Sequence, residues 1–112
     1  MARVEIVKTF RFEAAHRAGL RTYGYSYRAE IAVAGEIGSS GVVTPFDEIE
    51  RAFRPLTRIL DHSLLDEVDG LAQPTLENIA LWISERLRVD LPALSRVSIF
   101  RDGEGEACHL TF

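Results

Sequence analysis

Apolar residues occupy every second position in residues 25–37, YSYRAEIAVAGEI, at Tyr27, Ala29, Ile31 and Val33. Because side chains alternate between the two faces of a β-strand, this spacing predicts a strand with one buried face. Residues 3–15 alternate in a similar way, with Val4 and Ile6 on one face, and predict a partner strand that is bulged near Lys8. The two segments together indicate a long hairpin.

Two helices are expected in the middle of the chain. Thr44 stands at a plausible N-cap and Pro45 at the first helical position, so residues 45–60 should form a helix that Pro55 strains or interrupts. A second helix should begin near Pro74 and Thr75. Both segments carry apolar residues at helical spacing. These are Phe46, Ile49, Phe53, Leu56 and Leu60 in the first, and Leu76, Ile79, Ala80, Ile83 and Leu87 in the second.

Residues 96–102 and 106–112 read as two further strands joined by the turn Gly-Glu-Gly. The predicted order is therefore β-β-α-α-β-β, an α+β fold with a four-stranded antiparallel sheet and two helices on one face. We expect one domain over residues 1–112. The long hairpin should leave exposed sheet edges, which favours pairing between subunits and hence a homotrimer or homohexamer.

Composition narrows the class of protein. The chain of 112 residues has a net charge of −4 and no basic run, so we expect no nucleic-acid partner. It has no apolar stretch of membrane-spanning length and no signal-peptide pattern, so we expect neither a membrane association nor export. A single cysteine, Cys108, excludes an intrachain disulfide and fits the reducing cytoplasm. We interpret Cys108 as a small buried hydrophobe.

Three stretches together resemble one known family. They are FEAAHR at 12–17, YGYSYRAEI at 23–31, and ILDHSLLDEV at 59–68 followed by QPTLENIALWI at 73–83. Their order and spacing resemble the 6-pyruvoyltetrahydropterin synthase family, including its 6-carboxytetrahydropterin synthase branch, over nearly the whole chain. The resemblance implies a tunnelling fold in which trimers close a barrel and active sites lie between subunits.

The resemblance also implies a metal site that this sequence alters. The family has a His-Gly-His turn that binds zinc together with the histidine at the end of the first motif. Here His16 is kept, but the pair is replaced by Tyr23 and Tyr25. A free phenol has a pKa of about 10 and is a poor zinc ligand near neutrality. We therefore expect no metal and no cofactor. The two tyrosines either donate hydrogen bonds to a substrate carbonyl or simply fill the cavity.

Other family positions differ as well. The catalytic cysteine of the family lies before the His-Gly-His turn, where this chain has RAGLRT without a cysteine. The glutamate that binds the pterin aligns with Arg101, which presents donors only and favours an anionic or carbonyl ligand. Two alternatives remain: Arg101 is a surface residue beside Asp102, or Glu104 or Glu106 takes the anchoring role.

Asp61 and His62 match the proton-transfer residues of the family. An Asp–His pair can act as a general acid or base, whether within one chain or across an interface. The alternative is a histidine that caps the preceding helix. His16 is either a second acid/base group or a hydrogen-bonded core residue.

The remaining candidates concern binding. Thr75 and Glu77 match the substrate-facing motif, although an N-cap and a first-turn acid explain them equally well. Arg17, with Arg21 and Arg28, should add positive charge around the same mouth.

These features favour a zinc-independent enzyme that performs acid/base chemistry on a small, acidic carbonyl compound in an intersubunit pocket. Cyclisation, enolisation, elimination and retro-aldol cleavage all fit, so a lyase or cyclase is expected. The alternatives are a non-catalytic small-molecule-binding homologue and, third, zinc-dependent pterin synthesis.

Overall fold

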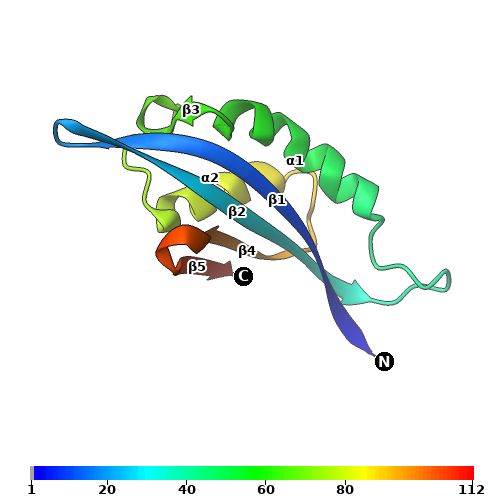
Figure 1. Cartoon of the computed structure of the whole chain (residues 1–112). Helices are drawn as coiled ribbons and strands as arrows, with labels where there is room; N and C mark the ends of the chain where they lie inside the picture. Colours follow the sequence, from blue (N-terminus) through cyan, green and yellow to red (C-terminus); the bar gives the residue numbers. More distant parts are fainter. Residues whose placement is uncertain (1) are drawn as a thin grey trace.

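The computed structural model describes residues 2–112 and shows a curved sheet covered by two helices (Figure 1). The elements follow in the order β1 (Arg3–Ala18), β2 (Arg21–Glu36), α1 (Phe46–Leu60), β3 (Ser63–Leu64), α2 (Leu76–Leu87), β4 (Leu94–Arg101) and β5 (Glu106–Thr111). Short 3₁₀ turns occupy Leu65–Glu67 and Asp102–Glu104. The predicted α+β order is confirmed.

The sheet has five strands in the order β3-β1-β2-β4-β5, one more than the four predicted. The additional strand, β3, is two residues long and runs parallel to β1, pairing Ser63 with Ala14 and Leu64 with Ala15. All other pairs are antiparallel. A strand this short has no periodicity, which is why the sequence pattern did not predict it.

The β1–β2 hairpin is longer and more regular than predicted. Its register runs without a break from Arg3 opposite Glu36 to Ala18 opposite Arg21, so the bulge expected near Lys8 is absent. Lys8 keeps the alternation and extends over the ring of Phe10, 5.8 Å from its centroid. The segment RAGLRT (residues 17–22) belongs mostly to the strands. Its turn is made by Gly19, which has a φ of 65° that favours glycine, and Leu20.

Helix α1 corrects two details of the prediction. Pro45, not Thr44, is the N-cap residue, and no side chain caps the helix there. The helix also continues through Pro55 without interruption. Pro55 and Arg51 are both exposed, so water can solvate the Arg51 carbonyl that a proline cannot reach.

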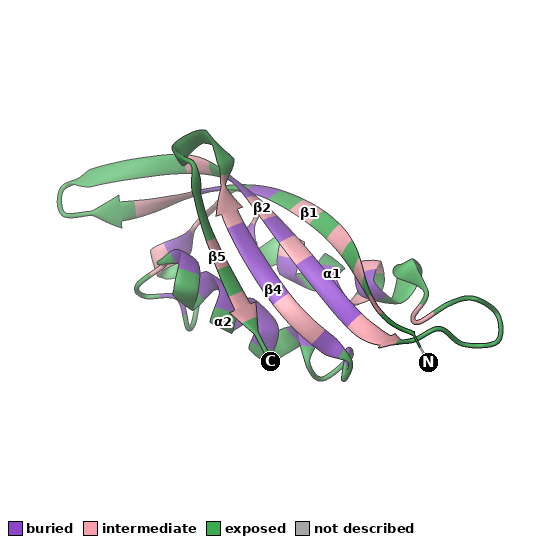
Figure 2. Ribbon diagram, turned by 90° about the horizontal axis from the view of Figure 1, so that it is seen from below, coloured by how far each residue is buried: buried purple, intermediate pink, exposed green. Residues whose placement is uncertain are grey.

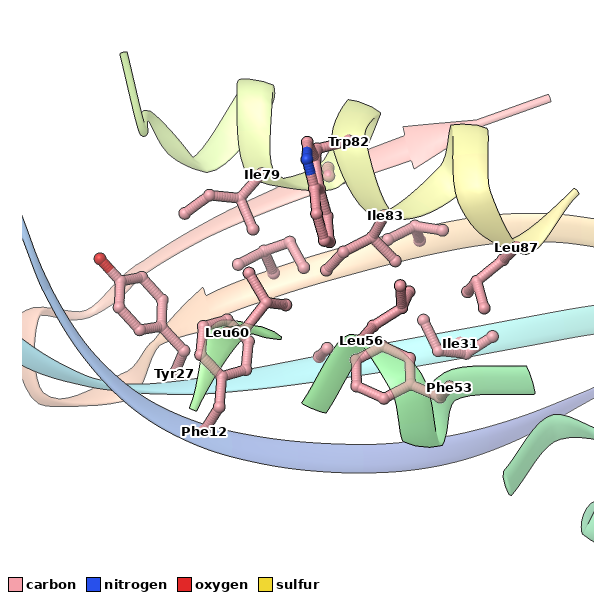
Figure 3. Packing of buried hydrophobic residues seen from close by; sticks show 14 of the residues in the cluster. Phe12, Tyr27, Ile31, Phe53, Leu56, Leu60, Ile79, Trp82, Ile83 and Leu87 are labelled. Carbon is pink, nitrogen blue, oxygen red and sulfur yellow. The ribbon is translucent and has the colours of Figure 1, made fainter. Parts of the chain in front are cut away.

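The core lies between the helices and one face of the sheet. Figure 2 shows the sheet in front, with buried residues along β2 and β4 and both helices behind it. In Figure 3 the buried side chains of α1, including Phe53 and Leu56, meet those of α2, including Ile83, above Ile31 of the sheet. Burying this apolar cluster supplies the main driving force for the fold.

Both edges of the sheet are largely unpaired in the single chain. Strand β3 covers only Ala14 and Ala15 of β1, and no described strand lies beyond β5. The hairpin tip extends past the helices and is exposed (Figures 1 and 2). None of the helices within residues 2–112 has the length and apolarity required to span a bilayer.

Candidate functional site

The hairpin end carries one imidazole and four aromatic side chains on one face. His16 lies opposite Tyr23, Ala14 opposite Tyr25, and Phe12 opposite Tyr27 in the β1–β2 register. The rings of His16 and Tyr25 stack at 5.6 Å between centroids, and the His16 and Tyr23 rings lie 6.1 Å apart. The two-residue period of the strands therefore brings the predicted His16–Tyr23–Tyr25 group together.

A cleft of about 840 Å³ opens beside this group. Its walls come from the end of β1, the segment before α2 and the β4–β5 turn. The charged and polar residues that line it are His16, Arg17, Gln73, Thr75, Glu77, Arg101 and Glu106. Five predicted site residues thus share one cleft, as does Glu106, which was one of the alternative anchors. Glu104, the other alternative, is not among the residues lining the cleft.

Arg101 lies in the wall of the cleft and is held on several sides. Its guanidinium carbon is 4.9 Å from the Tyr25 ring centroid, a cation–π contact. Its Nε atom is 3.1 Å from Oε1 of Glu106, although the two do not align as a hydrogen bond. The Arg101 side chain is only 17% exposed, whereas that of Glu106 is 52% exposed. Arg101 is therefore an inner residue and not the surface residue beside Asp102 that was one alternative.

The start of α2 supplies the opposite wall. Thr75 is the N-cap residue, and its hydroxyl accepts a hydrogen bond from the backbone N–H of Asn78 at 3.1 Å. The predicted capping role is confirmed, and the same residue lines the cleft. Glu77 follows in the first helical turn, where a carboxylate is favoured by the helix dipole.

The arginines predicted at the mouth separate into different environments. Arg17 lines the cleft, but its guanidinium pairs with Asp66 at 3.6 Å and Glu67 at 3.3 Å. Arg28 instead pairs with Glu30 and Asp102 outside the cleft lining. Arg21 is also absent from that lining. Within the single chain, neither Arg21 nor Arg28 adds charge to this mouth. Arg28 lies on the other face of the sheet from Tyr27, because alternate residues of a strand face opposite sides.

Asp61 and His62 form a direct pair within one chain. Oδ2 of Asp61 lies 3.0 Å from Nδ1 of His62. Oδ1 of Asp61 accepts a hydrogen bond from the backbone N–H of Glu13 at 2.9 Å, and the N–H of His62 donates to the Glu13 carbonyl. The bond from Glu13, followed by that from His62, lowers the pKa of the Asp61 carboxyl below its usual value. The pair is thus attached to the outer side of β1.

The backbone of His62 has a φ of 59°, in the left-handed region. It directly follows Asp61, the C-cap of α1, at a position where glycine or asparagine is usual. His62 thus lies at the end of α1, as the helix-end interpretation expected, but its side chain contacts Asp61 and not a carbonyl of the helix. The His62 side chain is 80% exposed and lies in a second hollow, about 430 Å³, which Glu13, Tyr25 and Ser26 also line. Within a single chain, Asp61 and His62 do not line the main cleft.

Three buried side-chain atoms within residues 2–112 lack a hydrogen-bond partner: Nε2 of His16, the hydroxyl oxygen of Tyr27 and Nε of Arg101. His16 and Arg101 line the cleft, and Arg101 and Glu106 both act electrostatically on the Tyr27 phenol. Buried polar groups normally have partners, so unsatisfied ones need an explanation. Tyr27 does not itself line the cleft, so the three atoms make the Arg101 end of the cleft and the residues behind it a candidate ligand site.

The donor set at the hairpin does not fit zinc. It offers one imidazole, His16, and two phenols, Tyr23 and Tyr25, whereas a zinc site uses imidazole, thiolate or carboxylate ligands. Among the described residues, no group of three or more His, Cys, Asp or Glu side chains is arranged to hold a metal. No chemical step is therefore assigned to a metal.

Cys108 and Tyr27 lie next to the residues of the cleft. Cys108 is half-buried and packs against the core, and burial, assisted by Glu77, raises the pKa of its thiol. The sequence pattern predicted Tyr27 on the buried face of its strand and did not indicate it as a site residue. The one available signal was a hydroxyl on a buried face where phenylalanine would pack equally well.

The chain was compared with known proteins. The family model described as 6-pyruvoyl tetrahydropterin synthase matches residues 5–111. A dihydroneopterin monophosphate aldolase of Pyrococcus furiosus is 34% identical over 109 residues, covering 91% of this chain and 93% of that protein. A 6-carboxy-5,6,7,8-tetrahydropterin synthase of Synechocystis is 36% identical over 107 residues, covering 84% and 83%.

The fold has close structural counterparts. The 6-pyruvoyl tetrahydropterin synthase of Caenorhabditis elegans superposes with a TM-score of 0.88 at 19% identity, covering 100% of this chain and 97% of that one. The chain therefore has the tunnelling fold, with a strand count one higher than predicted.

Proposed function

This chain belongs to the 6-pyruvoyl tetrahydropterin synthase family, and we propose that it is a metal-independent lyase that cleaves the side chain of a reduced pterin carrying an anionic group. The observation that carries the proposal is the cleft, in which the carboxylates of Glu77 and Glu106 lie with the guanidinium of Arg101. The names of two relatives support a pterin, and one of them supports an aldolase reaction on a monophosphate.

The cleft offers both kinds of polar contact that such a substrate requires. The amino-pyrimidinone edge of a pterin presents N–H donors, which the carboxylates of Glu77 and Glu106 can accept. A phosphate or other anionic oxygen requires donors, which Arg101 supplies. This reading revises the expectation that Arg101 disfavours a pterin: the arginine meets the anionic group, while the carboxylates meet the ring.

Retro-aldol cleavage needs acid/base groups and no redox partner. A base removes the proton from the side-chain hydroxyl on the second carbon from the ring. The bond between the first and second side-chain carbons breaks, and its electrons enter the ring C=N group. The second carbon leaves as part of an aldehyde. The resulting enamine carbon then takes a proton from an acid. In our proposal His62 moves the proton, Asp61 orients His62, and Tyr23 and Tyr25 donate hydrogen bonds to the developing carbonyl oxygen.

His62 reaches the cleft through assembly in this proposal. Asp61 and His62 lie beside β3 at one end of the strand order, whereas Glu106 begins β5 at the other end. Pairing the β5 edge of one copy with the β1 edge of the next would bring His62 of one subunit beside the cleft of its neighbour. A closed ring would repeat this arrangement at every interface and would leave no free edge.

The test is a turnover assay. Purified protein is incubated with 7,8-dihydroneopterin and with its monophosphate, in the presence of a chelator, and the pterin product and released aldehyde are separated chromatographically. We expect cleavage of the monophosphate in preference to the free pterin. His62→Ala should reduce turnover by about 10²- to 10⁴-fold, the usual contribution of a general acid/base.

Two results would contradict the proposal. Binding without turnover would favour the non-catalytic homologue instead. Turnover that disappears with the chelator and returns with added zinc would favour the zinc-dependent synthase interpretation.

A further inference from the structure

We propose that the Tyr27 hydroxyl and the Nε–H group of Arg101 form a buried pair of donors that binds one anionic oxygen of the ligand. Tyr27 would thereby be a ligand-binding residue and not only a core residue. The inference rests on the proposed function in one respect, that the cleft binds a small anionic ligand.

The ring of Tyr27 packs in the apolar core, whereas its hydroxyl points out of the core. The residue is 1% exposed, and its ring stacks on Phe12 with centroids 4.9 Å apart. Figure 3 shows the hydroxyl oxygen at the end of the cluster, pointing away from the apolar side chains. This oxygen has no hydrogen-bond partner within the described chain. A buried hydroxyl without an aligned partner destabilises the folded protein, and phenylalanine at this position would avoid that cost.

The groups around the hydroxyl identify what it faces. Burial raises the pKa of the Tyr27 phenol, while the charge of Arg101 and a contact from its side chain, too poorly aligned to count as a hydrogen bond, oppose this rise. Tyr25 and Glu106 also act on the phenol, and both raise its pKa. The Tyr27 ring meets the Tyr25 ring edge-on at 6.1 Å between centroids, and the Arg101 guanidinium carbon lies 4.9 Å from the centroid of the same Tyr25 ring. The hydroxyl is therefore on the Arg101 side of the cluster, behind the residues that line the cleft, and points away from the apolar side chains.

Arg101 brings the second unused donor. Its Nε atom is buried and has no aligned hydrogen-bond acceptor. Oε1 of Glu106 lies 3.1 Å from Nε of Arg101, but it does not lie along the Nε–H bond and so accepts no hydrogen bond from it. Two adjacent donors with no aligned acceptor suit a single oxygen that bears negative charge.

Glu106 is the group that such an oxygen would replace. Its side chain is half-exposed and begins β5, directly after Gly105, whose φ is 67°. A ligand oxygen that takes the place of Oε1 beside Arg101 would leave the Glu106 carboxylate free to accept N–H groups from the rest of the ligand. The Arg101–Glu106 ion pair is thus exchanged for two contacts with the ligand.

The test removes the hydroxyl and keeps the ring. Tyr27→Phe preserves the stack on Phe12, and its matched control is Ser98→Ala. Ser98 is also fully buried, but its hydroxyl is bonded to His109 and Arg96, and none of these three residues lines the cleft. We expect Tyr27→Phe to leave the thermal midpoint of the free protein unchanged or higher, and Ser98→Ala to lower it. Calorimetry with dihydroneopterin monophosphate should show binding weakened about tenfold to a hundredfold by Tyr27→Phe only.

A second measurement follows the hydroxyl directly. In protein labelled with ¹³Cζ-tyrosine, the Tyr27 signal is the one missing from Tyr27→Phe. It should shift on titration with dihydroneopterin monophosphate or with inorganic phosphate. A Tyr27→Phe variant that binds within twofold of the unmodified protein, or that is destabilised as much as Ser98→Ala, would overturn the donor pair.

The two proposals fail in different ways. If no pterin binds but phosphate still shifts the Tyr27 signal, the proposed function is wrong and the donor pair stands. If neither probe shifts the signal, the donor pair is wrong.

Discussion

Oδ2 of Asp61 lies 3.0 Å from Nδ1 of His62, between two residues adjacent in the chain. Neighbouring side chains usually point apart. Here the left-handed backbone of His62, bonded to Glu13, turns the two together. The geometry leaves Nε2 of an exposed imidazole free for proton transfer while the carboxylate fixes the ring.

We predict that Asp61→Asn lowers both turnover and thermal stability at neutral pH. The folded protein lowers the pKa of Asp61 below 3.8, so this stabilisation is present above the unfolded value and is lost as pH falls through the folded value. The difference in thermal midpoint between the two proteins should therefore shrink below about pH 4. Asp102→Asn is the control, because Asp102 has a similarly lowered pKa beside Arg28 but lies outside the cleft lining. It should change stability without changing turnover, and equal loss of turnover in both variants would contradict the assigned role.

We predict that the purified protein contains no stoichiometric zinc, because Tyr23 and Tyr25 replace imidazoles. Elemental analysis of protein prepared without chelator checks this. The double variant Tyr23→His with Tyr25→His should acquire about one zinc per chain, since it completes a three-imidazole set with His16. About one zinc in the unmodified protein, lost on His16→Ala, would disprove the prediction.

We predict that Arg101→Glu abolishes ligand binding and that Arg101→Lys also binds poorly, because an ammonium cannot reproduce the directed donors of a guanidinium. The matched experiment exchanges the pair: Arg101→Glu with Glu106→Arg should recover the stability lost in the single variant, but not the binding. Calorimetry with dihydroneopterin monophosphate measures affinity, and thermal melting measures stability. Tight pterin binding that Arg101→Ala leaves unaffected would show that Glu106 or Glu77 alone holds the ligand.

We predict a trimer or hexamer at micromolar concentration, because β1 and β5 each present an unpaired edge. Sedimentation velocity over a range of concentrations gives the mass. A monomer throughout would reject the assembly, and with it the placement of His62 beside a neighbour's cleft.

The alternating apolar positions of β1 and β2 made the hairpin and its buried face predictable, because a two-residue period indicates a β-strand with one buried face. The same alternation brought His16 and Tyr25 together as expected. Strand β3 was not predictable, since two residues show no period. The break expected at Pro55 was wrong, because a proline is tolerated in a helix where the carbonyl that loses its hydrogen bond, here that of Arg51, faces water. The sequence pattern did not show that this carbonyl is exposed.

The ligand-binding role proposed for Tyr27 could not be predicted from the sequence, for a different reason. A tyrosine on an apolar face predicts burial, and burial was found. Whether its hydroxyl has a partner depends on Arg101 and Glu106, more than seventy positions away in the chain. Only the three-dimensional arrangement shows that the partner is missing.

The long hairpin gives this small molecule dimensions of 55 × 26 × 19 Å and a radius of gyration of 14.9 Å. A compact chain of this length would have a radius of about 13 Å. In the single chain the hairpin is extended and the edges of β1 and β5 have unpaired backbone N–H and C=O groups, which can pair with strands of other proteins. If the predicted assembly forms, the concentration of the chain determines how many of these edges are covered by other copies. The hairpin that would pair with a neighbour in the predicted assembly is then also the part of the single chain most open to pairing with a wrong partner.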